Sequence, residues 1–280
     1  MSPAVVPLQG CSDAASGAAV AEPLIRVRHV DKIYGSARGD FTALKDVSLD
    51  IAPGEFVSIL GPSGCGKSTL LKCIGALVPI SGGTIEIAGK PVTEPPESAG
   101  FVFQRDVLLD WRTVLDNVLL PAEFYRLDKV KWRPRAEELL ATLGLDGSGS
   151  RYPWELSGGM RQRVAICRGL LLDPTLLLMD EPFGALDAIT RDELNLELGR
   201  IWERSNKTVL FITHSISEAV FLSSRVVVMS KNPGRIAEIV DIDLPRPRTL
   251  ADRETPEFVA YVRRLRSTFE SLGIMKRTVP

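Results

Sequence analysis

Gly61-Pro-Ser-Gly-Cys-Gly-Lys-Ser68 decides the fold of this chain, because its flanks are as informative as the loop itself. The apolar run Phe56–Leu60 precedes it, and a stretch of helical character, Lys67–Ile74, follows. A strand, a glycine-rich loop and a helix in this order form the setting of a phosphate-binding loop, whose backbone N–H groups converge on phosphate oxygens. We therefore expect a nucleotide-binding α/β fold, and a chance glycine turn is the weaker explanation.

The loop supplies most of the candidate nucleotide ligands. Lys67 should reach the β- and γ-phosphates and is therefore also a candidate catalytic residue. The Ser68 hydroxyl should ligate Mg²⁺, and Thr69 is placed for a further phosphate contact. The loop residues that we expect to bind nucleotide are Gly61, Pro62, Ser63, Gly64, Cys65, Gly66, Lys67, Ser68 and Thr69.

Three polar residues follow apolar strands downstream of the loop. Asp180 comes after Thr175–Met179, where it can hold Mg²⁺ directly or through water, since open α/β sheets place ligands at the carboxyl ends of strands. Glu181 comes next and is the natural general base for hydrolysis by water. His214 ends the strand Thr208–Thr213, where it could bond the γ-phosphate and orient that water. The alternatives are a helix-capping acid pair and a purely structural histidine.

Two further side chains complete the candidate site. Gln104 ends the short strand Gly100–Phe103, and its side-chain carbonyl is a hard oxygen donor suited to Mg²⁺ or to water. Its position could also signal the presence of a γ-phosphate to the segment that follows. Tyr34 precedes the phosphate loop in the turn Tyr34-Gly35, where its ring could stack on adenine, and ordinary packing is the alternative.

A second motif, Leu156-Ser-Gly-Gly-Met-Arg-Gln-Arg163, supplies a separate anion site. Ser157, Gly158 and Gly159 form a backbone nest of the kind that binds phosphate, at the start of a predicted helix Met160–Leu172. Because this nest is far from the phosphate loop in sequence, we expect the chain to sandwich nucleotide against another copy of itself.

The order of elements predicts a mostly parallel core sheet, added antiparallel strands and one inserted helical lobe. Strands are predicted at Leu24–Val30, Val47–Ile51, Phe56–Leu60, Thr84–Ala88, Gly100–Phe103, Thr175–Met179 and Thr208–Thr213, with Arg225–Met229 and Arg235–Ile242 as a closing hairpin. Apolar stripes through Leu115–Ala122 and Ala136–Leu143 place the helical lobe at about residues 105–157. A further helix is expected near Ala188–Glu203.

We divide the chain into three parts. Residues 1–22 are rich in Ala, Ser, Gly and Pro, and we expect a disordered extension that is no signal peptide. Residues 23–243 form the nucleotide-binding domain, and residues 244–280 a helical tail. The tail carries one apolar stripe, formed by Phe258, Val262, Leu265, Phe269 and Leu272. We favour packing of this stripe against its own domain over docking of a partner by about two to one.

Composition narrows the classes of partner. The 280 residues carry a net charge of −1, so no global basic field favours nucleic acid. The longest apolar runs are too short to cross a bilayer, so membrane association must come through another protein. The spacing of the four cysteines, Cys11, Cys65, Cys73 and Cys167, favours reduced thiols over a disulfide framework.

Together these motifs resemble the nucleotide-binding subunit of an ABC transporter, over about Leu24 to Ile242. In the family's order, Tyr34 is similar to the aromatic loop, Gly61–Thr69 to Walker A, Gln104 to the Q-loop, Leu156–Met160 to the signature, Leu176–Glu181 to Walker B, Gly184–Asp187 to the D-loop and His214 to the switch histidine. The chain is thus identified as a member of the P-loop NTPase class with an ABC cassette.

Met160 departs from the family pattern, which usually has glutamine there. Ser157, Gly158 and Gly159 are intact, so ATP binding in trans is expected to survive. Met160 also resembles a variant of the importers for nitrate, sulfonates, taurine and related compounds. Further stretches resemble that branch: Phe183–Asp187, Thr213–Ala219 and Met229–Arg235. Pyrimidine-precursor importers share these features, so the cargo stays open.

The resemblance implies an ATPase that energises import of a small solute, with ATP and Mg²⁺ bound. Two copies would lie head to tail, with each ATP between Lys67 of one copy and Ser157 of the other. The helical lobe would dock a transmembrane permease at the cytoplasmic face of the inner membrane, and a periplasmic or extracellular solute-binding protein would be an indirect partner.

Two other functions remain as alternatives. One is a soluble ABC ATPase acting on nucleic acid or the ribosome. Members of the family that act on DNA carry long coiled coils between the Walker A loop and the signature, whereas the stretch from Ser68 to Ser157 is short here and has no sustained heptads. The other is a non-catalytic regulatory cassette, which the presence of Asp180, Glu181 and His214 argues against.

Overall fold

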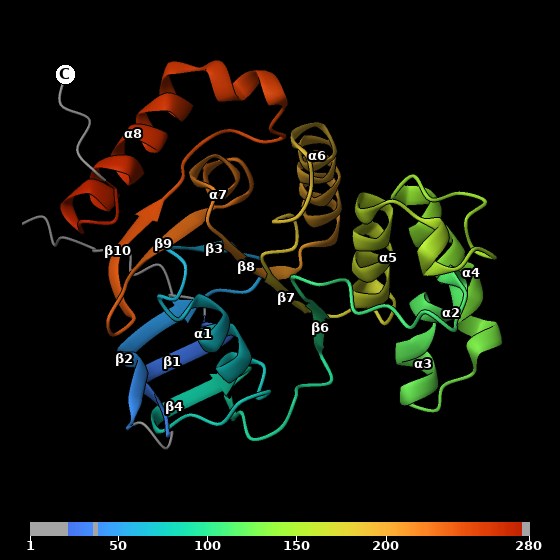
Figure 1. Cartoon of the computed structure of the whole chain (residues 1–280), viewed down its shortest axis with the longest axis horizontal. Helices are drawn as coiled ribbons and strands as arrows, with labels where there is room; N and C mark the ends of the chain where they lie inside the picture. Colours follow the sequence, from blue (N-terminus) through green and yellow to red (C-terminus); the bar gives the residue numbers. More distant parts are fainter. Residues whose placement is uncertain (1–21, 36–38, 276–280) are drawn as a thin grey trace, which may run out of the picture.

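The computed structural model describes residues 22–35 and 39–275, so the extension predicted over residues 1–22 lies almost entirely outside the described residues. Two sheets organise the fold (Figure 1). The smaller is antiparallel, in the order β2-β1-β4-β5, and comprises β1 (Ile25–Tyr34), β2 (Phe41–Ile51), β4 (Gly82–Ile87) and β5 (Lys90–Pro91).

The larger sheet has the order β10-β9-β3-β8-β7-β6. Its strands are β3 (Phe56–Leu60), β6 (Ala99–Val102), β7 (Leu176–Asp180), β8 (Thr208–Thr213), β9 (Arg225–Ser230) and β10 (Arg235–Asp241). All neighbouring pairs are parallel except β9 with β10, which close the sheet as an antiparallel hairpin. The predicted α/β class, with a mostly parallel core sheet and added antiparallel strands, is confirmed.

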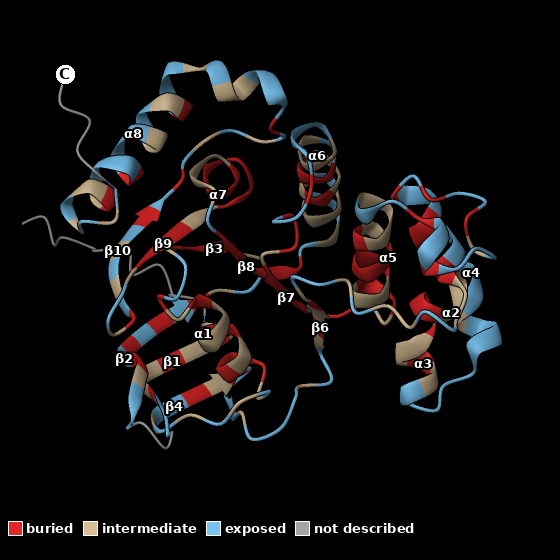
Figure 2. Ribbon diagram, viewed as in Figure 1, coloured by how far each residue is buried: buried red, intermediate tan, exposed pale blue. Residues whose placement is uncertain are grey.

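Helices cover both faces of the larger sheet, and every residue of β3, β7 and β8 is buried (Figure 2). Strand β7 shows the two-sided packing directly. Leu176 and Leu178 join the apolar cluster that includes α1 (Lys67–Ile74) and the antiparallel sheet. Leu177 and Met179 join the cluster on the opposite face. Burial on both faces explains why these strands are continuous apolar runs without polar alternation.

The opposite face is covered by α5 (Gly158–Leu170), α6 (Ala188–Ser205), α7 (Ile216–Leu222) and α8 (Pro256–Ser271). Helix α7 is a difference from the sequence analysis, which predicted no helix between β8 and β9. In the tail, a short 3₁₀ turn at Leu250–Glu254 precedes α8. Phe258, Leu265 and Phe269 of α8 are buried in the core cluster, so its apolar stripe packs on its own domain.

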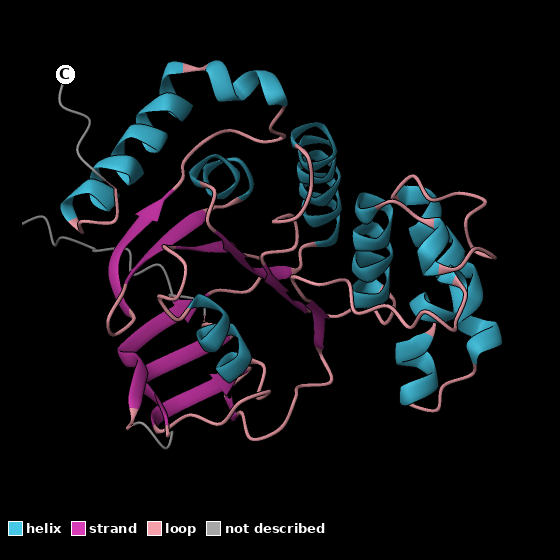
Figure 3. Ribbon diagram, in the orientation of Figure 1, coloured by secondary structure: helices cyan, strands magenta, loops and turns pink. Residues whose placement is uncertain are grey.

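The helical lobe projects from one end of the larger sheet and contains no strand among its described residues (Figure 3). It comprises α2 (Val114–Val118), α3 (Leu120–Phe124), α4 (Lys129–Thr142) and the 3₁₀ turn Pro153–Glu155. Helix α5 packs against α2 and α4, so in space the helical unit continues beyond residue 157. The stripe through Leu115–Ala122 is split between two short helices, because Pro121 has no N–H to extend α2.

Candidate nucleotide-binding site

The phosphate loop leaves the buried strand β3 and enters α1 through two glycines with positive φ. Gly64 has a φ of 77° and Gly66, the residue before α1, has a φ of 96°. Side-chain-bearing residues rarely adopt this conformation, which explains the glycine spacing. The loop wraps around Lys67, whose Nζ donates to the carbonyl oxygens of Gly61 at 3.0 Å and Pro62 at 3.2 Å.

The turn between β9 and β10 supports the loop from behind. The Gly234 N–H donates to the Ala43 carbonyl at 3.1 Å, and its own carbonyl accepts from the Lys45 N–H at 3.0 Å. A Cβ atom on Gly234 would lie 2.1 Å from the Cys65 carbonyl oxygen. The hairpin therefore touches the phosphate loop and the antiparallel sheet at one point.

Asp180 is the last residue of β7, and its Oδ1 accepts a hydrogen bond from the Ser68 hydroxyl of α1 at 2.7 Å. Asp180 is buried, and burial raises the pKa of its carboxyl, while the hydrogen bond from Ser68 opposes that rise. A buried carboxylate beside a hydroxyl is a pair of hard oxygen donors. The predicted proximity of these two candidate Mg²⁺ ligands is thus present in the structure.

The Glu181 carboxylate contacts three other candidate side chains of the site. Its Oε1 lies 3.3 Å from Lys67 Nζ, and its Oε2 lies 3.3 Å from His214 Nδ1. The Gln104 side-chain amide approaches the same Oε2 at 3.5 Å. Gln104, Glu181 and His214 follow the ends of β6, β7 and β8, and Lys67 begins α1 after the loop that leaves β3, as expected where parallel strands end at one edge.

A cavity of about 400 Å³ opens beside this cluster. Its lining includes the predicted residues Tyr34, Ser63, Gly64, Gly66, Lys67, Ser68, Thr69, Gln104 and Glu181. Gly61, Pro62 and Cys65 do not line it, and Cys65 is buried. The sequence analysis missed Phe41, a lining residue that pairs with Tyr34 across β1 and β2 and presents a second aromatic ring. The sequence holds a signal for it, because the Gly- and Ser-containing stretch 35–40 between Tyr34 and Phe41 is typical of a loop that joins two strands.

Ser157 lies apart from this cavity, which has no lining residue from α5. Ser157 is exposed and caps α5, its Oγ accepting from the Met160 N–H at 3.3 Å. Gly159 is close to α6, since a Cβ there would lie 2.6 Å from Thr190 Cγ2. The Ser-Gly-Gly turn (Ser157–Gly159) and the phosphate loop are therefore separate surfaces of one chain.

Polar contacts tie the segment after Gln104 to α5, which the sequence analysis did not anticipate. Arg161 Nε donates to Asp106 Oδ2 at 2.9 Å, and its Nη1 donates to the Leu156 carbonyl at 2.9 Å. The Arg168 guanidinium donates to the carbonyl oxygens of Asp106 at 2.7 Å and Val107 at 2.8 Å. These contacts join the segment that follows Gln104 to α5, the helix that Ser157 caps.

Known proteins share this sequence and fold. A family model described as "ABC transporter" matches residues 44–184. The chain is 47% identical over 224 residues to a taurine import ATP-binding protein of Rhizobium johnstonii, covering 80% of this chain and 86% of that protein. It is 46% identical over 239 residues to a nitrate import ATP-binding protein of Synechococcus elongatus, covering 84% of this chain and 36% of that protein.

A solved structure agrees with these sequence matches. The dimeric post-hydrolysis structure of an ATP-binding cassette bound to ADP and Pi aligns with a TM-score of 0.71 and 35% sequence identity. The alignment covers 79% of this chain and 100% of that one. The resemblance inferred from the motifs is confirmed.

Proposed function

Since this chain belongs to the ABC transporter family of ATP-binding proteins, we propose that it is the ATP-hydrolysing subunit of a membrane importer for a small solute of the taurine or nitrate kind. The observation that carries the hydrolytic role is the convergence of Lys67, Gln104 and His214 on the Glu181 carboxylate. Two of the aligned relatives are named for the import of taurine and of nitrate, which supports this class of cargo.

The residues divide the chemistry among them. Glu181 is the general base that accepts a proton from the attacking water. Lys67, held by two loop carbonyls, offers its charge to the β- and γ-phosphates of ATP. His214 orients the Glu181 carboxylate through Nδ1 and offers its imidazole to the γ-phosphate side. Tyr34 and Phe41 provide aromatic faces for adenine.

Mg²⁺ fits the donor set of this site. Ser68 Oγ and Asp180 Oδ1 are hard oxygen donors 2.7 Å apart, and Gln104 could add a side-chain carbonyl. A divalent cation would favour the ionised form of Asp180, which burial disfavours. When bound, Mg²⁺ neutralises charge on the β- and γ-phosphates.

A second copy of the chain would complete the ATP site. Ser157, Gly158 and Gly159 form the N-terminus of α5, where Ser157 and Gly158 are exposed, and none of the three lines the cavity of their own chain. The natural role of this Ser-Gly-Gly turn is to contact the γ-phosphate held by a partner subunit, in a head-to-tail pair with two ATP molecules. The similar cassette solved as a dimer supports this arrangement.

The permease would dock in an apolar groove between the core and the lobe. This groove has a volume of about 530 Å³ and is lined by residues that include Phe101, Phe103, Val107 and Phe124. Val107 and Phe124 are exposed, as is Trp111 on the adjoining loop. An exposed apolar patch beside Gln104 suits a cytoplasmic loop of a membrane subunit, which would receive motion driven by ATP.

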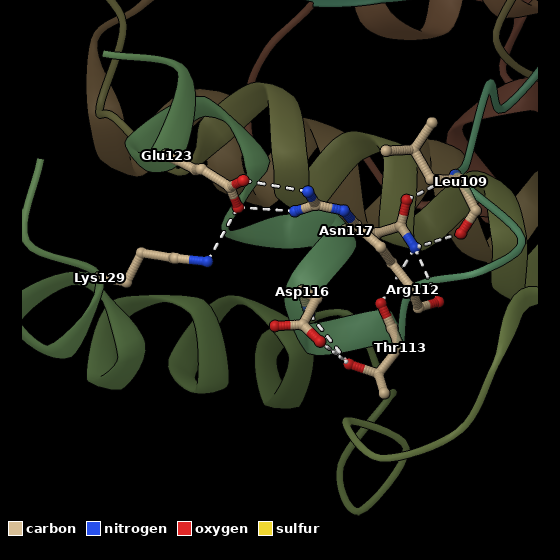
Figure 4. Close-up of polar contacts among 7 residues, drawn as sticks. All are labelled: Leu109, Arg112, Thr113, Asp116, Asn117, Glu123 and Lys129. Carbon is tan, nitrogen blue, oxygen red and sulfur yellow. Dashed lines mark hydrogen bonds and ion pairs between the residues drawn. The ribbon is translucent and has the colours of Figure 1, made fainter. Parts of the chain in front are cut away.

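The loop that carries Trp111 is fixed from inside the lobe (Figure 4). The fully buried Asn117 side chain donates to the carbonyls of Leu109, Arg112 and Thr113 and accepts from the Leu109 N–H. Trp111 is therefore displayed on a rigid support, as a docking surface needs.

In this role the chain would lie on the cytoplasmic face of the inner membrane, where it would be held by its contact with the permease. In the two described ranges, 22–35 and 39–275, no helix combines the length and apolarity that a membrane span requires. A periplasmic or extracellular solute-binding protein would deliver the cargo, and the net charge of −1 gives no reason to expect nucleic acid as a partner.

Reconstitution tests this function. The full chain is co-expressed with a candidate permease, and the purified material is placed in liposomes with taurine or nitrate and a matching binding protein. We expect solute-stimulated ATP hydrolysis, abolished by Lys67→Ala, whose ATP affinity should also fall. Absence of a co-purifying polytopic membrane protein, or hydrolysis stimulated instead by nucleic acid or ribosomes, would refute the importer role.

A further inference from the structure

We propose that Glu218 and Arg191 are positioning residues that link the segment carrying His214 to the D-loop turn, Gly184–Asp187. This inference rests on the proposed ATPase function, because it assigns the pair an effect on the hydrolysis step. Neither residue lines the ATP cavity, and each acts through another group.

One end of the link holds the segment around His214. Glu218 lies in the first turn of α7 and is 6% exposed. Its Oε2 accepts from the Thr213 hydroxyl at 2.5 Å, and Thr213 Oγ1 accepts in turn from the Ser215 N–H at 3.0 Å. Thr213 and Ser215 flank His214, so the backbone is fixed on both sides of the imidazole.

The other end reaches the D-loop turn. Arg191 Nε lies 3.5 Å from Glu218 Oε1, and Arg191 Nη2 donates to the Leu186 carbonyl at 2.6 Å. The turn is tied to the general base, since the Gly184 N–H donates to the Glu181 carbonyl at 3.1 Å. Glu218 and Arg191 thus connect the two backbone segments that carry His214 and Glu181.

The chemistry of the pair favours positioning over simple stability. Burial raises the pKa of the Glu218 carboxyl, and the Thr213 hydroxyl and the Arg191 guanidinium oppose that rise. Glu218 is buried while the Arg191 side chain is 32% exposed, so desolvation of the carboxylate offsets much of the attraction and the pair adds little net stability, but it can fix one arrangement of the segments it joins. Glu218 is a buried acid that contacts both Thr213 and Arg191, so it can fix the arrangement of the segments that carry these two residues.

An independent contact keeps the surrounding helices together when the pair is removed. Arg253, from the 3₁₀ turn of the tail, pairs with Asp192 of α6 at 2.6 Å. Its guanidinium also lies 4.8 Å from the ring centre of Phe221 in α7. Variants of Glu218 and Arg191 are therefore expected to fold, and their effects can be assigned to local geometry.

The first test is steady-state kinetics of the full chain with Mg-ATP. Glu218→Gln keeps the size of the side chain and an acceptor for Thr213 but removes the charge that faces Arg191. We expect kcat to fall about tenfold while KM and the unfolding midpoint stay near the wild-type values. Arg191→Met should behave alike, and Arg204→Met, at an exposed position of the same helix, should match wild type.

A double-mutant cycle separates positioning from a merely structural role. If Glu218 acts through His214, Glu218→Gln should cause no further loss of kcat in a His214→Ala background. An equal fractional loss in both backgrounds would overturn the proposal, as would wild-type kcat in the single variant.

A second readout does not depend on hydrolysis. Amide hydrogen exchange in the nucleotide-free chain should increase at residues 213–215 and 184–187 in both pair variants, but not in Arg204→Met. If the wild-type chain fails to hydrolyse ATP, the proposed function fails, and the exchange experiment still decides the link. Unchanged exchange at these two segments would refute it.

Discussion

At the scale of single residues, the site depends on where one carboxylate points. Glu181 has a φ of 43°, which is strained for a residue with a side chain. Its backbone is held there, since the Glu181 N–H donates to the Ile212 carbonyl at 3.0 Å. Glu181 follows the last residue of β7, and its side chain points toward Lys67 and His214. Local strain is thus retained at the residue that we propose as the general base.

Glu181→Gln should lower ATP hydrolysis by roughly 10²–10⁴-fold, because the amide cannot accept the proton of the attacking water. ATP binding should persist, since the phosphate loop and Ser68 are unchanged. Phosphate release and a nucleotide-binding titration on the same preparation measure the two effects. Undiminished turnover would show that another group is the base.

The strand-end residues could be predicted from sequence, because parallel strands must bring their carboxyl ends to one edge. Asp180, Glu181 and His214 each follow an apolar strand, and the structure places all three at that edge. The Lys67–Glu181 and Glu218–Arg191 pairs could not be predicted, since they depend on side-chain conformations across elements distant in sequence.

At the scale of elements, the helical lobe shows where periodicity misleads. An apolar stripe predicted continuous helical character through Leu115–Ala122, but Pro121 interrupts it and Leu119 both ends α2 and precedes α3. Helix α7 was missed because its seven residues are too few to show a helical period between two strands. Strand β8 and helix α1 were predicted at their observed bounds, whereas β1 and β2 extend beyond the predicted strands Leu24–Val30 and Val47–Ile51.

Asn117→Ala should destabilise the chain by about 2–3 kcal/mol, because it removes the side-chain hydrogen bonds that hold the part-buried backbone of Leu109, Arg112 and Thr113. Urea unfolding measures this change. Glu137→Ala, which removes an exposed ion pair with Arg133 in the same lobe, should cost less than about 0.5 kcal/mol. Equal costs in the two variants would contradict the structural role of Asn117.

Acid should weaken the contact between α3 and α4. Hydrogen bonds from Arg112 and then Lys129 lower the pKa of Glu123 to about 2, from 4.5. Because the folded-state pKa is depressed, the stabilisation is fully present above pH 4.5 and is lost as the pH falls toward 2. The difference in unfolding midpoint between wild type and Glu123→Gln should therefore shrink over this range.

Arg112→Met is the companion variant for this titration. It removes the bidentate partner of Glu123, so the acid-dependent difference should largely disappear in that background as well. A difference between wild type and Glu123→Gln that stays constant from neutral pH to pH 2 would contradict this assignment.

At the scale of the whole molecule, one chain carries two proposed nucleotide-contacting surfaces, and the structure places them apart. Their separation could be inferred from sequence, because the phosphate loop and the Ser157–Gly159 nest are independent motifs. The groove lined by Phe101 and Phe124 could not be inferred, since it forms only when the lobe is placed beside β6. Packing between distant segments creates such surfaces and leaves no local pattern.

Ser157→Arg should block ATP-dependent dimerisation, because a bulky cation would fill the nest. Light scattering in a Glu181→Gln background, where ATP is retained, measures the association. Ser271→Arg adds the same charge at an exposed position of α8 and should dimerise like its parent. A dimer of normal affinity in Ser157→Arg would argue against completion of the site in trans.

The contact of Gly234 with the phosphate loop has a practical consequence for anyone who modifies this protein. A surface hairpin far along the chain would ordinarily be chosen for an affinity tag, a fluorophore or an engineered insertion. Here, any added atom on the glycine would push against the Cys65 carbonyl and deform the ATP cradle from its rear. The exposed end of α8 offers a safer attachment point, since its surface contributes nothing to that cradle.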